Sequence, residues 1–239
     1  MTVRSQHIEY EADGRRAVGE LSFDDAVDGV RPGVLVCHEA TGLTDHAKNI
    51  AHRLAELGYI SFAVDYFGDG QPLPRAQAME RLGELVADPL RTRQAGIAGL
   101  NVLLADRRCD HAKVAAIGYC FGGSMVLELA RGGAQLACVV GFHSRLETPR
   151  PDDARNIVAK VLVNIGAEDP WILADERAAF ESEMRAGRVD WQMNLYGGAR
   201  HSFTNPASDG STHPGIIYNE KADKRSWASM LNLFGETLV

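Results

Sequence analysis

A cysteine lies between glycines where a strand-like run of apolar residues gives way to a helix-like run. The segment KVAAIGYCFGGSMVLELA, residues 113–130, places Cys120 between Gly118 and Gly122. In a nucleophile elbow the central side chain sits on a tight, strained turn, and its neighbours must lack a Cβ that would clash. The N-terminus of the following helix favours a thiolate. The pattern indicates a thiol nucleophile; a glycine-rich turn that buries a cysteine is the alternative.

Two further residues follow in the order nucleophile, acid, histidine. The strand-like run KVLVNIGAED ends at Glu168 and Asp169, where parallel sheets commonly place functional groups. We favour Asp169 over Glu168 as the acid; the alternative role for Asp169 is to cap the next helix. His201 of GGARHSF lies in a loop after the last strand-like run, unless it is only a surface residue. A histidine there can accept the thiol proton, and the acid can fix its tautomer.

Strand-like and helix-like runs alternate along the chain, which predicts the scaffold for these residues. Crossovers of this kind give a mostly parallel central sheet with helices on both faces. The Asp13-Gly14 turn joins two early strands, which predicts an antiparallel hairpin at one edge. We find no linker, so we expect one α/β domain over residues 1–239. The expected strands are 7–12, 18–23, 33–38, 60–65, 113–118, 136–143, 160–169 and 189–197; the expected helices are 44–59, 75–87, 90–105, one after the elbow, 172–186, and a last one that ends at Leu238.

In the predicted helix 44–59, Thr44 is the expected N-cap and Gly58 the expected stop. Ile50, Leu54 and Leu57 recur at helical spacing and should face the core.

Composition and charge exclude several classes of function. The 239 residues carry a formal net charge of −7, which argues against a nucleic-acid partner. The chain shows no secretory signal and no apolar run of about 18 residues, so we expect no membrane partner and a cytoplasmic location. The cysteines show no CxxC pairing, which argues against a zinc site and a disulfide framework. We expect no metal and no cofactor, and the oligomeric state stays open.

Three segments together resemble the dienelactone hydrolases, a cysteine-using branch of the α/β-hydrolases. They are Gly118-Tyr119-Cys120-Phe121-Gly122-Gly123, Gly166-Ala167-Glu168-Asp169 and His201-Ser202-Phe203. The resemblance implies an α/β-hydrolase fold, a Cys120–Asp169–His201 triad, and an ester or lactone substrate cleaved through an acyl-thioester. It also implies that Glu39 of CHEATGL hydrogen-bonds the thiol and is displaced when substrate arrives. From the residues alone, Glu39 could equally be a surface carboxylate.

The tetrahedral oxyanion of such a reaction needs two N–H donors. In this fold one is the amide of the residue after the nucleophile, here Phe121. The other comes from the loop after the third strand, where Ala40 is our candidate.

One departure from the family pattern concerns the substrate carboxylate. Family members that cleave the carboxylated dienelactone hold it with arginines, one of which lies shortly after the His-Ser-Phe segment. Here that position reads Thr204-Asn205. The loss favours neutral short-chain esters or lactones as substrates. Arginines in the helical region after the fourth strand remain candidates to bind a substrate carboxylate; these are Arg75, Arg81 and Arg91. Aromatic residues that follow strand ends or the elbow either line the pocket or pack in the core; these are Tyr66, Phe67, Phe121, His143 and Trp171.

Two other functions would also place a cysteine in such a turn. Class I glutamine amidotransferases also carry a Gly-x-Cys-x-Gly elbow, but a glutamate follows their histidine by two residues, where this chain has Phe203. The second alternative is a non-catalytic binding protein that retains the fold. Turnover of a p-nitrophenyl ester would separate this alternative from an enzyme.

Overall fold

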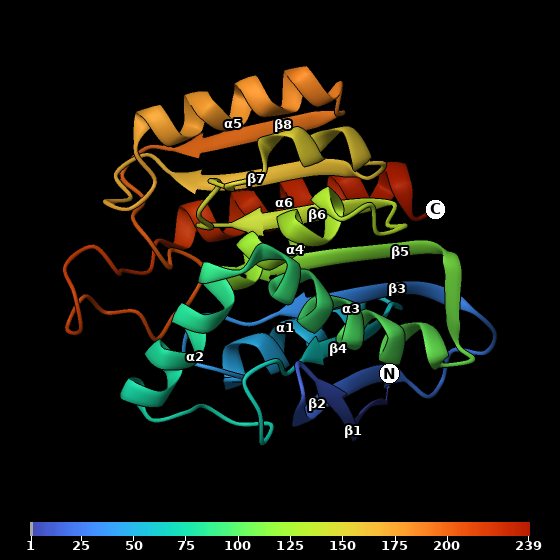
Figure 1. The fold of residues 1–239 in the computed structure, drawn as a ribbon. Coiled ribbons are helices and arrows are strands. Elements are labelled where there is room, and N and C mark those ends of the chain that lie inside the picture. Colours follow the sequence, from blue (N-terminus) through green and yellow to red (C-terminus); the bar gives the residue numbers. More distant parts are fainter. Residues whose placement is uncertain (1) are drawn as a thin grey trace.

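The computed structural model describes residues 2–239. A single eight-stranded sheet crosses the molecule in the order β1-β2-β4-β3-β5-β6-β7-β8 (Figure 1). Strands β3 to β8 run parallel, whereas β1 and β2 form an antiparallel hairpin and β2 pairs antiparallel with β4. The predicted parallel sheet with an edge hairpin is confirmed. The strands are β1 (Val3–Ala12), β2 (Arg15–Asp24), β3 (Arg31–Cys37), β4 (Ile60–Val64), β5 (Cys109–Tyr119), β6 (Cys138–Phe142), β7 (Lys160–Gly166) and β8 (Trp191–Tyr196).

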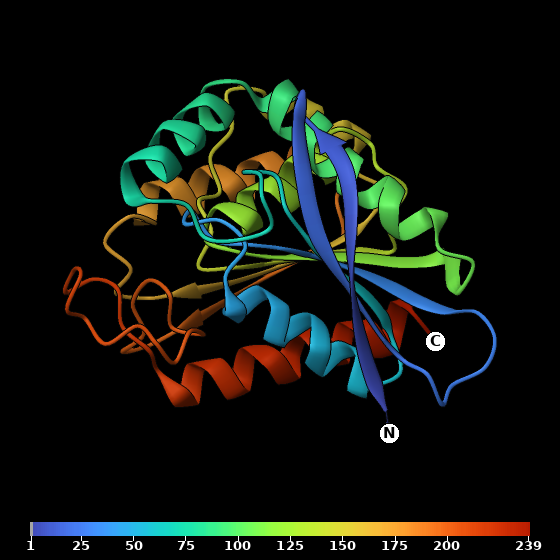
Figure 2. The ribbon, with the colours of Figure 1, turned by 90° about the horizontal axis from the view of Figure 1, so that it is seen from below.

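Helices cover both faces of the sheet (Figure 2). One face carries α1 (Asp45–Glu56) and α6 (Glu220–Thr237). The opposite face carries α2 (Arg75–Ala87), α3 (Pro89–Ala105), α4 (Phe121–Arg131) and α5 (Ala174–Gly187). A short 3₁₀ helix, η1 (Pro151–Asn156), was not expected from the sequence.

The continuous apolar strands fit burial on both faces. Along β3, Val34 and Val36 join the core under α1 and α6, whereas Leu35 and Cys37 join the core under the other helices. Alternation of this kind follows from the two-residue period of a strand. The sheet is therefore held rigidly between two packed layers.

Most strand and helix boundaries differ from the predicted ones by a few residues, and three of the differences bear on the site or the core. Helix α1 ends at Glu56, and Leu57 is 52% exposed instead of facing the core, because it lies in the turn that Gly58 completes with a positive φ. Strand β6 ends at Phe142, and His143 takes a φ of 41°, which no strand residue adopts. The polar loop after His201, expected to end near residue 214, continues to Asn219, and α6 begins at Glu220.

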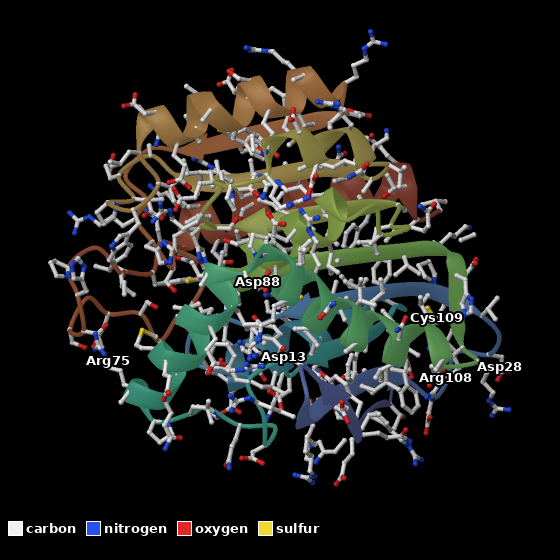
Figure 3. The ribbon with its side chains drawn as sticks, in the orientation of Figure 1. Asp13, Asp28, Arg75, Asp88, Arg108 and Cys109 are labelled. Atoms are coloured by element: carbon white, nitrogen blue, oxygen red, sulfur yellow. The ribbon has the colours of Figure 1, made fainter. Side chains whose placement is uncertain are left out.

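The carboxyl ends of the parallel strands share one edge of the sheet, where the arrowheads of β6, β7 and β8 point (Figure 1). Glu39, Cys120, His143 and Asp169 each follow one of these strand ends closely. At the opposite edge β3 and β5 begin, and Asp28, Arg108 and Cys109 lie there (Figure 3). None of the helices formed by residues 2–239 combines the length and the hydropathy that a membrane-spanning segment needs.

Candidate active site

Cys120 occupies a strained turn between β5 and α4. Its φ and ψ are 54° and −119°, values that cost free energy for a residue with a side chain. A Cβ on Gly122 would collide with the Cys37 carbonyl group, and one on Gly118 would collide with the Gly122 backbone. Both glycines therefore permit a close backbone approach that holds the turn. Cys120 is partly exposed at the N-terminus of α4, whereas the three other free cysteines are buried.

His201 and Asp169 meet at this edge of the sheet. The Nδ1 atom of His201 lies 2.7 Å from Oδ2 of Asp169, and both residues are buried. Backbone hydrogen bonds to Gly215 and Ile217 hold the histidine on both sides of its own peptide unit. This arrangement can fix the imidazole so that Nε2 is the nitrogen available for proton transfer.

The two neighbouring acids have different partners. The Oδ1 atom of Asp169 accepts a hydrogen bond from the Trp171 amide at 2.9 Å, while its other oxygen faces His201. Glu168 is exposed and accepts a hydrogen bond from the Gly198 amide at 2.8 Å. The N-cap position of helix α5 is Leu173, so Asp169 does not serve as its N-cap.

The imidazole of His201 is electrostatically tuned. Burial disfavours its charged form, but the Cys120 sulfur and the Asp169 carboxylate outweigh burial and raise the pKa of His201 to about 10. A histidine in this environment can hold a proton next to a thiolate. The three side chains can therefore act together in acyl transfer.

Glu39 lies beside these residues and is buried. Its Oε1 atom accepts a hydrogen bond from Ser202 Oγ at 2.8 Å, and its Oε2 atom accepts one from Asn205 Nδ2 at 3.1 Å. The Nδ1 atom of His46 lies 3.6 Å from Oε2. Burial would raise the pKa of Glu39, yet the neighbouring His46 and the hydrogen bond from Ser202 lower it to about 2. Among the described residues, no hydrogen bond joins Glu39 to Cys120.

The three partners of Glu39 were missed from the sequence. Ser202 and Asn205 lie within four residues of His201, so that proximity was an available signal. His46 lies in the first turn of α1, and nothing in its local sequence points to Glu39.

Two backbone amides near Cys120 are free to donate. Phe121 is the first residue of α4, and the first N–H groups of a helix have no partner within it. In the part of the chain that the structure describes, neither the Phe121 amide nor the Ala40 amide donates to a backbone carbonyl. Both can therefore serve an oxyanion.

Two aromatic residues from the predicted pocket flank His201. The Trp171 ring meets the imidazole edge to face at 5.0 Å, and the His143 ring does so at 5.1 Å. The Nε2 atom of His143 is 2.9 Å from Thr204 Oγ1, and burial holds the pKa of His143 well below the ordinary value. His143 is therefore a neutral neighbour.

Tyr66, Phe67 and Phe121 pack in the core behind the site. The Tyr66 hydroxyl donates to the His38 carbonyl group, and its ring stacks on the His38 ring at 3.8 Å. Phe67 and Phe121 pack against Tyr66 at 5.4 Å and 5.8 Å.

The candidate arginines have other partners. Arg81 is buried, and its guanidinium donates to the Tyr66 carbonyl group and forms ion pairs with Asp13 and Glu84. Arg91 forms ion pairs with the same two acids. Asp13 lies where the tip of the β1–β2 hairpin approaches α2 and α3, whereas Arg75 is exposed at the start of α2 (Figure 3). Arg81 and Arg91 are therefore neutralised by protein carboxylates.

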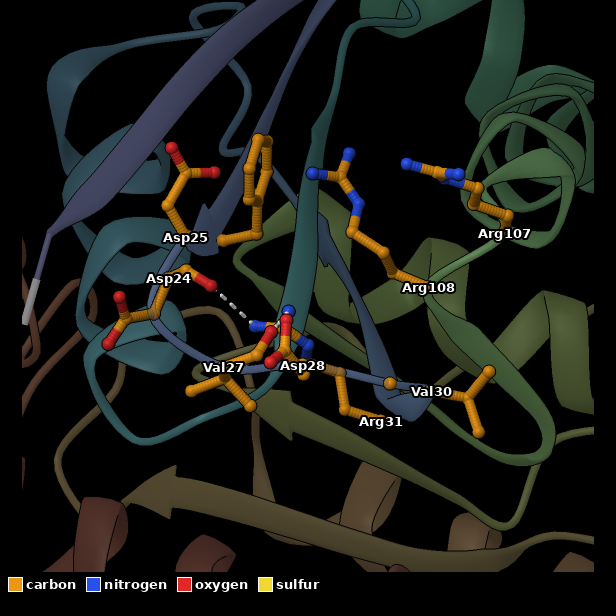
Figure 4. A pocket seen from close by; sticks show the side chains of 10 residues that line it. Asp24, Asp25, Val27, Asp28, Val30, Arg31, Arg107 and Arg108 are labelled. Atoms are coloured by element: carbon orange, nitrogen blue, oxygen red, sulfur yellow. Dashed lines mark hydrogen bonds between the residues drawn. The ribbon is translucent and has the colours of Figure 1, made fainter.

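A cavity of ≈ 390 Å³ lies away from this site (Figure 4). Its walls come from the end of β2, the start of β3 and the turn before β5, at the opposite edge of the sheet. Charges of both signs line it, among them Asp24, Asp25, Asp28, Arg31, Arg107 and Arg108. Over residues 2–239, no three His, Cys, Asp or Glu side chains are grouped so that they could hold a metal ion.

Comparison with known proteins identifies the family. The model of the dienelactone hydrolase family matches residues 24–238. A solved structure titled "m3DLH" is 43% identical, with a TM-score of 0.95 and 99% of each chain covered. The structure of a dienelactone hydrolase-like promiscuous phosphotriesterase from metagenomic libraries is 40% identical, with a TM-score of 0.94 and 99% of each chain covered. A Salmonella typhimurium protein named "Putative carboxymethylenebutenolidase" is 28% identical over 88% of this chain and 79% of its own length. The chain therefore belongs to the dienelactone hydrolase family and is a hydrolase of the ester and lactone type.

Proposed function

We propose that this enzyme cleaves neutral carboxylic esters or lactones by transferring the acyl group to Cys120. In this proposal His201 is the general base and acid, and Asp169 orients it. The observation that carries the proposal is the 2.7 Å contact between Asp169 and His201 beside a cysteine in a strained elbow.

In the first half-reaction, the thiol proton of Cys120 passes to His201, the sulfur attacks the carbonyl carbon, and the carbonyl π electrons move to oxygen. The Phe121 and Ala40 amides donate to that oxyanion, a contact whose loss typically costs about 2.7–4 kcal/mol of barrier. Collapse of the intermediate breaks the C–O bond, and His201 gives its proton to the leaving oxygen. The acyl group is then a thioester on Cys120; in a lactone the leaving oxygen stays attached to it.

In the second half-reaction, water attacks the thioester while His201 accepts a proton from it. A second tetrahedral oxyanion forms at the same two amides. Its collapse breaks the C–S bond, releases the acid and restores the sulfur with its proton shared with His201. Asp169 stabilises the imidazolium in both halves without taking its proton.

The test is a quenched-flow reaction with p-nitrophenyl acetate, followed by peptide mass spectrometry. The wild type should release p-nitrophenol in a burst and carry an acetyl group on the Cys120 peptide. Cys120→Ala should lose both the turnover and the adduct. Unchanged turnover in Cys120→Ala would refute the proposal and would favour another nucleophile.

Neutral phosphotriesters are a second candidate substrate class. The related structure at 40% identity is titled a promiscuous phosphotriesterase, and a triester, like a neutral ester, needs no cation to bind it. The commitment of Arg81 and Arg91 to Asp13 and Glu84 agrees with this class. Release of p-nitrophenol from diethyl p-nitrophenyl phosphate, absent in Cys120→Ala, would support it; no release from the wild type would rule it out.

Two alternatives receive less support. A glutamine amidotransferase would need an acid two residues after its histidine, but Phe203 is there and is fully buried. A binding protein without activity would not need the Asp169–His201 contact. Ester turnover by the pure wild type, absent in Cys120→Ala, separates the proposed activity from both.

A further inference from the structure

Glu39 is held between two segments that are far apart in the sequence. On one side Ser202 and Asn205, both in the loop of His201, donate to its two carboxylate oxygens. On the other side His46, in the first turn of α1, lies 3.6 Å from Oε2. The carboxylate therefore faces the histidine loop and not the sulfur.

The His46 ring is fixed by packing and not by hydrogen bonds. It meets the Tyr119 ring edge to face at 4.9 Å, and Tyr119 in turn stacks on Phe142 at 4.7 Å. Tyr119 and Phe142 are the last residues of β5 and β6, so the ring rests on the sheet directly behind the elbow. The side chain of His46 is only 9% exposed.

A buried carboxylate needs compensation for the water that it loses. Ser202 and Asn205 supply neutral donors, and His46 supplies the one basic group within ion-pair distance of Glu39 among residues 2–239. Removal of His46 would leave Glu39 with a weaker hold in its present orientation. A carboxylate released from this orientation could turn to another donor at the site, such as the Cys120 thiol.

We propose that His46 is a positioning residue that holds Glu39 toward the histidine loop, so that Cys120 pairs with His201 before any substrate arrives. The inference rests on the proposed role of Cys120 as the nucleophile. It makes the resting enzyme ready to attack, whereas a glutamate bonded to the thiol would keep the sulfur protonated. Neutral electrophiles then need no charged group of their own to release the thiol.

Other titratable groups face His46 from each element packed against it. Tyr119 contacts its ring from β5, and His143 after β6 and Asp223 on α6 lie within electrostatic reach of it. Glu39 is the acid in ion-pair distance. The pH profile of Cys120 alkylation is therefore compared in proteins with and without Glu39.

The test measures the rate at which iodoacetamide alkylates Cys120, followed on its peptide across the acidic and neutral pH range. His46→Phe keeps an aromatic ring against Tyr119 but removes both nitrogens. We expect alkylation at neutral pH to slow by roughly tenfold, equivalent to about 1.4 kcal/mol, and its pH midpoint to rise. His46→Gln keeps a donor and should recover most of the rate.

The controls separate positioning from folding and from the proposed function. In a Glu39→Ala background, His46→Phe should change the alkylation rate little, because the group it positions is gone. Asn205→Ala weakens the same hold and should slow alkylation in the same direction. Wild-type rates in His46→Phe, or an equal loss in the Glu39→Ala background, would overturn the inference. The alkylation assay needs no ester turnover, so a failure of the proposed function would appear only in the Cys120→Ala activity assay.

Discussion

Two adjacent carboxylates, Glu168 and Asp169, have different hydrogen-bond partners because their side chains leave the backbone in different directions. The amide of Asp169 donates to the Gly166 carbonyl group, and its side chain points inward to His201. Glu168 is directed to the Gly198 amide at the surface. The direction of the side chain, and not its charge, therefore decides which of the two carboxylates pairs with His201.

Exchange of each acid for its amide tests that selection. Asp169→Asn should lower kcat for a p-nitrophenyl ester by roughly 10⁴, because the amide stabilises the wrong imidazole tautomer. Glu168→Gln should change kcat by less than about twofold, since surface substitutions have small effects. Steady-state kinetics of the two variants make the comparison, and the opposite ranking would identify Glu168 as the acid.

The proton on His201 should also stabilise the fold. The pKa of His201 is about 10 in the folded protein, against an ordinary value of 6.5. A raised pKa gives stabilisation that is complete below pH 6.5 and is lost as the pH rises toward 10. We expect the difference in the free energy of unfolding between wild type and His201→Asn to shrink through that window, measured by denaturant titration.

The Cys120→Ala variant is the control for this window. Without the sulfur, only the Asp169 carboxylate raises the pKa of His201, so that pKa should fall. The stabilisation by the His201 proton should then be lost at a lower pH. A difference in unfolding free energy that stays constant from pH 6.5 to 10 would contradict the assignment of the proton to His201.

At the scale of elements, local patterns were sufficient for the scaffold but not for side-chain partners. The strand–turn–helix around Cys120 was predictable because glycine spacing and apolar runs are local signals. The link between Glu39 and Ser202 spans 163 positions, and the pairing of Asp13 with Arg91 spans 78. Contacts of that range depend on how whole layers pack, so neither the hold on Glu39 nor the neutralised arginines could be predicted from the sequence.

The elbow is the element whose geometry leaves least room for change. In Gly122→Ala the new methyl group would meet the Cys37 carbonyl group, which is backbone and cannot rotate away. We expect a loss of about 1–3 kcal/mol in unfolding free energy, typical of overpacking. Ester turnover should fall further, because Cys120 and the Phe121 amide move with the turn.

Gly235→Ala in α6 is the matched control. Nothing lies within 4 Å of a Cβ at that position, and the residue is exposed. Alanine is the better helix former, so the variant should gain about 0.5–1 kcal/mol and keep full activity. Equal effects of the two substitutions in thermal unfolding would show that the elbow is not tightly packed.

At the scale of the whole molecule, both cores share one sheet, and buried ion pairs join the helices on one face. Arg131 on α4 pairs with Glu183 on α5 and with Glu128, and Arg93 on α3 pairs with the same Glu128. We therefore predict that residues 1–239 unfold as one domain. Far-ultraviolet circular dichroism and tryptophan fluorescence should give the same denaturant midpoint; two separate midpoints would indicate two units.

The preference for a neutral or a charged substrate also depends on the whole molecule. The protein has a net charge of −7, Arg81 and Arg91 are paired with Asp13 and Glu84, and the Glu39 carboxylate lies beside Ser202. Arg81 and Arg91 are therefore not free to pair with a substrate carboxylate, and desolvation of a carboxylate without such a partner costs several kcal/mol. We expect kcat/KM for a neutral short-chain ester to exceed that for the carboxylated dienelactone.

Both substrates should be assayed on one preparation, together with Asn205→Arg. This variant places a cation beside Glu39 and the histidine loop, so it should raise kcat/KM for the dienelactone relative to the neutral ester. If the wild type already prefers the dienelactone by roughly tenfold, or about 1.4 kcal/mol of transition-state binding, an arginine must serve the substrate. Arg75 would then be the residue to substitute next, since it is exposed and lies at the start of α2.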